Sequence, residues 1–427
     1  MLTTKYVRDH LDEIKESFSR RKSDYPIDKL LDLDKTWREQ KTQLQELQAK
    51  RNKASIEVGE LKKEGNEIKE KIESLAFLKE QIDELDKTVS KNEKEIDKLL
   101  WNMPNVLHKS VKFGKDETEN IEIKKWGNPR TVTIGHVELL EKNKLIDIER
   151  AAKIAGARFY YLQGDLVLLA KSLERFALDS LVKKGFTPLQ TPYLMKREYY
   201  KGVTGLGDFE DSLYAAGTPK EAKKEESDDE EMFLVATSEH PMAAMHSGEL
   251  FYKDNLPIKY AGVSPCFRRE AGTHGKDTKG IFRVHQFDKI EQFILCTEED
   301  SWKMYDELIA NEEEIFQQLG IPYRVVEMCT GDIGIVAAKK IDLEGWFPSQ
   351  QKYREVTSAS NCTDWQSSRL DIKYDEKGER KYVHTLNATA ISIERALTVI
   401  AENYANENGT ITVPDALVPY MGKKIIQ

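Results

Sequence analysis

The segment from Cys266 to Leu295 holds the side chains best suited to chemistry, and its pattern predicts two β-strands around a basic, glycine-rich loop. Because alternate side chains of a strand share a face, Arg268 and Glu270 are expected to point the same way on the first strand. One face of the second strand is predicted to carry two cations, an imidazole, a phenyl ring and a carboxylate: Arg283, His285, Phe287, Lys289 and Glu291. Such a face suits a ligand that combines phosphates, a flat ring and an ammonium group.

The opposite face of the second strand is partly apolar and suits a core: Phe282, Val284, Gln286, Asp288, Ile290, Gln292 and Ile294. Two glycine-rich segments fail as nucleotide motifs. Gly272–Thr278 has the wrong glycine spacing for a P-loop, with Asp277 at the required Ser/Thr position, and Gly205–Glu210 is not a dinucleotide fingerprint. A nucleotide bound by this chain is therefore expected on an antiparallel sheet.

A heptad pattern runs from Leu33 to Leu99 and predicts a coiled coil. Most positions outside the seam are Lys, Glu, Asp or Gln. The seam of the first half is Leu33, Trp37, Gln40, Leu44, Leu47, Arg51, Ala54, Val58 and Leu61. The seam of the second half is Leu75, Leu78, Ile82, Leu85, Val89, Asn92, Ile96 and Leu99.

The pair Gly65-Asn66 is the one good break in this pattern, and it predicts two antiparallel helices of about 32–35 residues, each about 50 Å long. The alternative is one continuous helix that dimerises, because the apolar phase nearly survives across Gly65. The predicted domains are residues 1–110, with a hairpin over about 30–102, and residues 111–427.

The second domain is predicted to contain a helix over Asp165–Lys184, a series of strands separated by turns, and a final amphipathic helix over Ala390–Ala405. Residues 218–231 are acidic and of low complexity, which is typical of an exposed hairpin tip. Runs of strands with helices at their edges predict the α+β class, with a mixed, mainly antiparallel sheet flanked by helices.

The 427 residues are 33% charged with a net charge of −9, which excludes a globally basic nucleic-acid-binding protein, so any nucleic-acid contact must be local. No apolar run approaches the roughly 20 residues of a membrane span, and the N-terminus has no apolar signal core. The four cysteines are far apart and form no C-x-x-C pair. A cytoplasmic protein with reduced thiols, no zinc and no structural metal is therefore expected.

Four blocks carry a family resemblance: Ala236–Pro241 (ATSEHP), the segment around Arg268 and Arg283, Arg354–Gln366 (REVTSASNCTDWQ) and His384–Leu397 (HTLNATAISIERAL). Their order, following a coiled-coil arm, resembles seryl-tRNA synthetases, which are class II aminoacyl-tRNA synthetases. The resemblance covers the whole chain and lies nearest to archaeal members of the bacterial-type branch. It implies activation of L-serine with ATP and transfer of serine to tRNA-Ser, and to tRNA-Sec where that tRNA exists.

For ATP, the resemblance implies that Arg268 bridges the serine carboxylate and the α-phosphate, which suits a guanidinium fork. Arg283 and Arg395 would meet the γ-phosphate, and with Arg268 they form the expected catalytic set. Phe287 would stack on adenine beside the Val284 backbone. The remaining expected ATP contacts are Arg269, Glu270, Glu355, Val356, Thr357 and Ser358.

For serine, the resemblance assigns the α-ammonium to the loop containing Thr237, Ser238 and Glu239, and the hydroxyl to Glu291. Asn387 and Thr389 would complete the pocket. A site built to pair a hydroxyl rejects alanine strongly, because its own polar groups are left unpaired.

Glu355 and Ser358 would hold Mg²⁺ through the ATP phosphates, since Mg²⁺ prefers oxygen ligands and few protein contacts. The arm would bind the long variable arm of tRNA-Ser, with Arg51, Asn52, Lys53, Lys62 and Lys63 as candidate contacts. The helix before Pro192 resembles the class II dimer interface, so a homodimer is expected.

Two other functions fit parts of the sequence: an activator that loads serine onto a carrier protein, and a non-enzymatic coiled-coil scaffold. The long arm disfavours the first, because carrier-loading relatives lack it. The joint presence of Arg268, Glu291, Glu355 and Arg395 disfavours the second. Three residues depart from the usual family pattern: Trp365 replaces Phe, Ser368 replaces Arg, and Ala388 replaces Gly.

Overall fold

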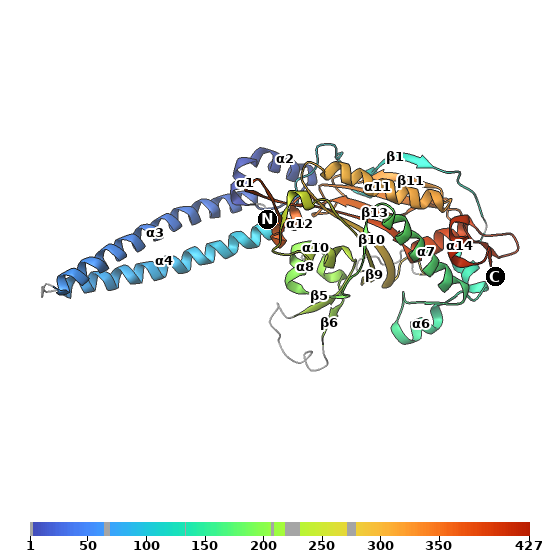
Figure 1. Cartoon of the computed structure of the whole chain (residues 1–427), viewed down its shortest axis with the longest axis horizontal. Coiled ribbons are helices and arrows are strands. Elements are labelled where there is room, and N and C mark those ends of the chain that lie inside the picture. The colour runs from blue at the N-terminus through green and yellow to red at the C-terminus, as the bar shows by residue number, and fades with distance from the viewer. Residues whose placement is uncertain (1–2, 64–68, 133, 206–208, 218–230, 271–278) are drawn as a thin grey trace. The chain divides into compact units, whose positions relative to one another are not determined.

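The computed structural model describes residues 3–63, 69–132, 134–205, 209–217, 231–270 and 279–427 (Figure 1). Two compact units divide the chain, the first ending at Pro104 and the second beginning at Asn105. Among the described helices, none is both long and apolar enough to cross a membrane. All four cysteines are buried free thiols.

The N-terminal unit consists of α1 (Thr4–Asp9), α2 (Leu11–Arg21) and two long helices, α3 (Ile27–Lys63) and α4 (Lys69–Trp101). The long helices lie side by side (Figure 1). Their direction is antiparallel, because Lys71 at the start of α4 pairs with Glu57 near the end of α3, at 3.2 Å between Nζ and Oε2. The two-helix prediction is confirmed, and the continuous dimerising helix is wrong. The predicted break at Gly65-Asn66 lies outside the described residues.

The predicted seam forms the contact between α3 and α4. Leu44, Ile82 and Val89 are buried in one cluster, with Trp37 and Leu47 packed against it. The polar seam residues pair with each other, since Asn92 Nδ2 donates a hydrogen bond to Gln40 Oε1 at 2.9 Å. A polar pair at matched seam positions favours one register of the two helices.

The second unit is built on an eight-stranded sheet in the order β1-β11-β12-β13-β16-β10-β9-β4. Neighbouring strands are antiparallel except for the parallel edge pair of β4 and β9, so the predicted α+β class is confirmed. The strands are β1 (Ile121–Trp126), β4 (Thr187–Gln190), β9 (Ile258–Phe267), β10 (Gln286–Cys296), β11 (Tyr323–Glu327), β12 (Lys339–Phe347), β13 (Lys352–Asn361) and β16 (His384–Ser392).

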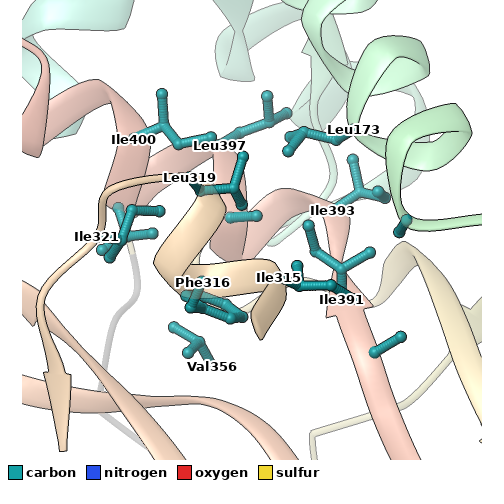
Figure 2. Close-up of a cluster of buried hydrophobic side chains, with 14 of the residues drawn as sticks. Leu173, Ile315, Phe316, Leu319, Ile321, Val356, Ile391, Ile393, Leu397 and Ile400 are labelled. Carbon is teal, nitrogen blue, oxygen red and sulfur yellow. The ribbon is translucent and has the colours of Figure 1, made fainter. Parts of the chain in front are cut away.

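Three helices cover one face of this sheet: α7 (Asp165–Val182), α11 (Ser301–Gln318) and α13 (Ile393–Asn403). Figure 2 shows how Leu173 of α7, Phe316 of α11 and Leu397 of α13 meet Val356 and Ile391 of the sheet. Ile290 and Ile294 of β10 belong to the same core, as their apolar spacing predicted.

Three shorter helices lie against the other face: α8 (Arg197–Val203), α10 (Glu239–Ala244) and α12 (Trp365–Leu370). Phe293 and Leu295 of β10 point to this side and pack with Tyr200, Phe233 and Met242. In the second half of β10, Phe293 and Leu295 therefore face the short helices, while Ile290 and Ile294 face the main core.

Two predicted boundaries near the candidate site are wrong. The β9–β10 ladder ends at the pair Phe267 and Gln286, so Arg268, Glu270, Arg283 and His285 lie beyond the strands. The physical reason is that the pairing becomes one-sided. The Arg268 amide still donates to His285 O at 2.9 Å, but the His285 amide donates to Arg158 O at 3.0 Å, and Glu270 has a left-handed φ of 49°. The predicted helix from Ala390 begins at Ile393 instead, because Ala390–Ser392 continue β16.

Candidate active site

Two neighbouring cavities share one side chain, Arg268. The larger cavity, of about 340 Å³, is lined on its polar side by Thr237, Glu239, Arg268 and Asn387. Its apolar wall is formed mainly by residues 333–337, Val203 and Phe209. The smaller cavity, of about 20 Å³, is lined by Arg268, Glu270, Phe282, Arg283, Val284, Phe287, Ser392, Glu394 and Arg395. A guanidinium between two cavities can bind a group in each of them.

Arg268 is held in place from three directions. Its Nε donates to Ala236 O at 3.2 Å, and its own carbonyl lies 2.8 Å from His285 Nδ1. The guanidinium carbon lies 5.3 Å from the centre of the Phe287 ring, which is within cation–π range. The fork is therefore oriented before any ligand binds.

The loop before α10 brings Thr237 and Glu239 to the larger cavity. Ser238 fastens this loop to β9, since its buried hydroxyl donates to Gly262 O at 3.1 Å. A Cβ on Gly262 would lie 2.8 Å from Ser238 Oγ, so glycine permits this close approach. The Ser238 hydroxyl thus anchors the loop.

Glu239 lies at the first position of α10 and accepts a hydrogen bond from Gln366 Nε2 of α12 at 2.9 Å. Its amide donates to Thr237 Oγ1 at 3.2 Å. Burial, together with the nearby Glu291 carboxylate, raises the pKa of Glu239 to about 7. Glu239 can therefore change its charge near neutral pH.

A buried ion pair lies in the centre of β10, on the strand face that points toward the larger cavity. Lys289 Nζ contacts Glu291 Oε2, and the two residues are 5% and 2% exposed. Thr389 of β16 donates its hydroxyl to the same oxygen at 3.2 Å. Asn387 shares a face of β16 with Thr389 and lines the cavity itself. Glu291 and Thr389 are thus brought together, although neither of them lines the cavity.

The smaller cavity is flanked by cations and aromatic rings. Arg283 Nη1 pairs with Glu270 Oε2 at 2.9 Å, which closes the gap left where the strands end. The Arg354 and Arg395 guanidinium carbons lie 3.9 and 5.2 Å from the centre of the Phe282 ring. Side chains of these kinds can contact a flat ring and negative oxygens.

Glu355 and Ser358 lie on β13, beside the positive charge of Arg395. Arg395 Nη1 contacts Glu355 Oε1 at 3.0 Å. Burial would raise the pKa of Glu355, but Arg395 and Lys340 outweigh it and lower that pKa to about 2. Glu355 is therefore ionised at neutral pH, as an oxygen ligand must be.

These donors fit Mg²⁺, which takes one or two protein oxygens and completes its shell with phosphates and water. Asp342 lies opposite Ser358 on β12, and its buried Oδ1 forms an ion pair with Lys340 Nζ at 3.4 Å. Within the same described residues, no group of three His, Cys, Asp or Glu side chains could hold a metal ion.

Some residues expected at the site line neither cavity. Arg269 is exposed, Val356 packs in the core, and Thr357 is a buried residue of β13. On the N-terminal unit, Asn52, Lys53, Lys62 and Lys63 are exposed on α3, and Arg51 is half-buried with its Nη2 3.3 Å from Asn52 Oδ1.

The sequence prediction gave no role to several residues that the fold places here: His240, Lys340, Asp342, Gln366 and Glu394. It placed Lys289 on the ligand-binding face but did not predict its contact with Glu291. Alternate residues of a strand share a face, so the sequence placed Lys289 beside Glu291. This spacing was the signal from which their contact could have been predicted. Gln366 lay inside a quoted block, but only the packing of α12 beside α10 reveals its bond to Glu239.

The buried pair generates a test of stability. In Lys289→Met the Glu291 carboxylate loses its buried partner, which we expect to lower the free energy of unfolding of this unit by roughly 3–5 kcal/mol. Lys423→Met is the control, since it breaks the 2.7 Å pair with Asp165 at a side chain that is 41% exposed, and should cost at most about 1 kcal/mol. Denaturant unfolding followed by tryptophan fluorescence measures both, and equal losses would contradict the importance of the buried pair.

Two family models match the chain: the seryl-tRNA synthetase N-terminal domain over residues 1–107, and the tRNA synthetase class II core domain (G, H, P, S and T) over residues 222–404. The serine–tRNA ligase of Thermococcus sibiricus is 46% identical over 454 residues, covering 100% of this chain and 97% of the relative. That of Methanoculleus marisnigri is 47% identical over 430 residues, covering 99% of each chain.

A solved structure agrees with these relatives. The crystal structure of seryl-tRNA synthetase from Pyrococcus horikoshii complexed with ATP matches with a TM-score of 0.92 and 43% identity, covering 100% of this chain and 99% of that chain. Full-length matches well above 30% identity, together with matching family models at both ends, leave one conclusion: this chain belongs to the seryl-tRNA synthetase family.

Proposed function

We propose that this protein activates L-serine with ATP to give seryl-adenylate and pyrophosphate, and then transfers serine to the 3′ end of tRNA-Ser, and to tRNA-Sec where that tRNA occurs. One observation carries the proposal: Arg268 lines both cavities. The larger cavity is assigned to serine, and the residues that line the smaller one are assigned to the adenosine and α-phosphate. Arg268 would then bind the serine carboxylate and the α-phosphate together.

In the first step, a serine carboxylate oxygen forms a bond to the α-phosphorus, and the bond between the α-phosphorus and the bridging oxygen breaks to release pyrophosphate. No side chain needs to form a covalent bond. Arg268 holds both reactants, while Arg283 and Arg395 offset the negative charge of the phosphates. Glu355 and Ser358 would hold Mg²⁺, which supplies further charge neutralisation when it is bound.

Recognition of serine is assigned to polar groups on both sides of the cavity. Glu239 and Thr237 would accept hydrogen bonds from the α-ammonium, and Glu291, fixed by Lys289 and Thr389, would accept one from the hydroxyl. Asn387 completes the wall. Phe287 and Val284, which line the smaller cavity, would contact adenine, with Glu270 and Arg283 nearby.

Transfer to tRNA is assigned to both units. The domain over residues 1–110, with Arg51, Asn52, Lys53, Lys62 and Lys63 on its long helices, would bind the long variable arm of tRNA-Ser. We further propose that the protein is cytoplasmic and that it forms a homodimer. The dimer is supported by exposed apolar side chains on α7, where Val167, Leu168 and Val182 are 37%, 51% and 47% exposed. Light scattering at micromolar concentration should give twice the chain mass of 49.1 kDa, and a monomer mass would contradict the dimer.

Serine-dependent exchange between ATP and pyrophosphate tests the activity, with threonine, alanine and glycine as control substrates. We expect exchange with serine well above all three. In Glu291→Ala the preference for serine over alanine should fall by at least about tenfold, because the hydroxyl loses a charged hydrogen-bond partner. Absence of exchange with serine would refute the proposed function, and an unchanged preference would refute the role of Glu291.

The raised pKa of Glu239 predicts how the serine KM depends on pH. Below about pH 7 Glu239 is protonated and neutral, so it cannot pair with the ammonium, and above that pH it is a carboxylate. The serine KM should therefore fall as pH rises from about 6 to about 8. Glu239→Gln should raise the KM and remove this pH dependence. A wild-type KM that stays constant or rises over this range would contradict the assignment.

A further inference from the structure

His240 is a cavity-lining histidine that the proposed mechanism leaves unused. It is the second residue of α10, directly after Glu239, and it lines the larger cavity although it is only 4% exposed. The rings of Tyr200 and Phe209 contact it edge-on, with centroid distances of 5.1 and 5.8 Å. These contacts fix the orientation of the imidazole toward the cavity.

The two ring nitrogens of His240 differ in their surroundings. Nδ1 is buried and has no hydrogen-bond partner among the described residues, whereas Nε2 is not one of the buried, unpartnered atoms found there. Since His240 lines the larger cavity, we take Nε2 as the nitrogen available to it. Burial, reinforced by the positive charges of Arg268 and Lys289, lowers the pKa of His240 to about 3. The imidazole is neutral at physiological pH, and in the tautomer with its proton on Nδ1 the free lone pair lies on Nε2.

The α-ammonium group of the expected substrate has one more hydrogen-bond donor than the acceptors assigned to it so far. An α-ammonium group carries three N–H donors. Thr237 Oγ1 and the Glu239 carboxylate, both at the larger cavity, supply two acceptors. His240 lies next to Glu239 on the same wall, and a neutral ring does not repel an ammonium as a protonated one would.

We propose that His240 is a substrate-contacting residue, whose cavity-facing Nε2 accepts the third hydrogen bond from the α-ammonium of the amino acid. The inference rests on the proposed function and adds a recognition residue to it. It predicts that His240 discriminates ligands by their ammonium group, while Glu291 discriminates them by their hydroxyl.

The test compares two ligands in two variants. His240→Val removes the acceptor, and His240→Asn keeps a polar acceptor on a shorter side chain. In His240→Val the serine KM should rise by at least about tenfold, with the ATP KM changed less than about twofold, as expected for losing one hydrogen bond to a charged group. The inhibition constant of 3-hydroxypropanoate, which keeps the carboxylate and hydroxyl but lacks the ammonium, should not change. His240→Asn should recover part of the lost affinity.

His246→Val is the matched control, since this histidine lies just beyond α10 and uses both nitrogens outside the cavities, at 2.8 Å from Glu249 Oε2 and 3.0 Å from Tyr260 Oη. It should leave the serine KM unchanged. If His240→Val does not keep the wild-type melting temperature, His240→Asn decides instead. In that variant the affinity for serine relative to the affinity for 3-hydroxypropanoate should fall.

Three outcomes separate the possibilities. Weaker binding of serine alone supports the inference. An unchanged serine KM, or an equal loss for serine and 3-hydroxypropanoate, overturns it while the proposed function stands. Absence of serine-dependent exchange in the wild-type protein refutes the proposed function, and the inference with it.

Discussion

The pairing of β10 with β9 on one side and β16 on the other is the constraint on which the site depends. It sets Glu291 opposite Gly262 and Thr389, and it ends at Phe267 and Gln286, so that Arg268 leaves the sheet between the two cavities. A shift of one residue would turn Glu291 and Lys289 into the apolar core and expose Ile290. The buried pair of Lys289 and Glu291 favours the correct register, since the opposite face is covered by α7, α11 and α13.

The electrostatics of the site follow from this placement. Cations gather where phosphates are expected, and they hold Glu355 ionised with a pKa lowered to about 2. Near the larger cavity the balance differs: burial and Glu291 raise the pKa of Glu239, while Arg268 and Lys289 help to keep His240 neutral. One sheet thus maintains an ionised carboxylate, a carboxyl group that titrates near neutrality and a neutral imidazole close to one another.

The sequence predicted the elements with regular spacing and missed what depends on partners distant along the chain. The heptads of α3 and α4 and the apolar spacing of β10 were recognisable because one periodic face is buried in each. The strand ends at Phe267 and Gln286 were not, because the contact of His285 with Arg158 decides them. The motif blocks identified Arg268 and Glu239, but the role of Lys289 and the place of His240 at the cavity required the packed cavity wall.

The central claim is that Arg268 joins the serine and ATP cavities. Isothermal titration calorimetry of serine, with and without saturating α,β-methylene-ATP, which resists cleavage between the α- and β-phosphates, tests it most directly. In the wild-type protein the nucleotide should tighten serine binding by at least about fivefold. Arg268→Lys should lose this coupling, because an ammonium lacks the fork that binds two groups at once. Equal serine affinity with and without nucleotide in the wild type, or coupling retained in Arg268→Lys, would contradict the claim.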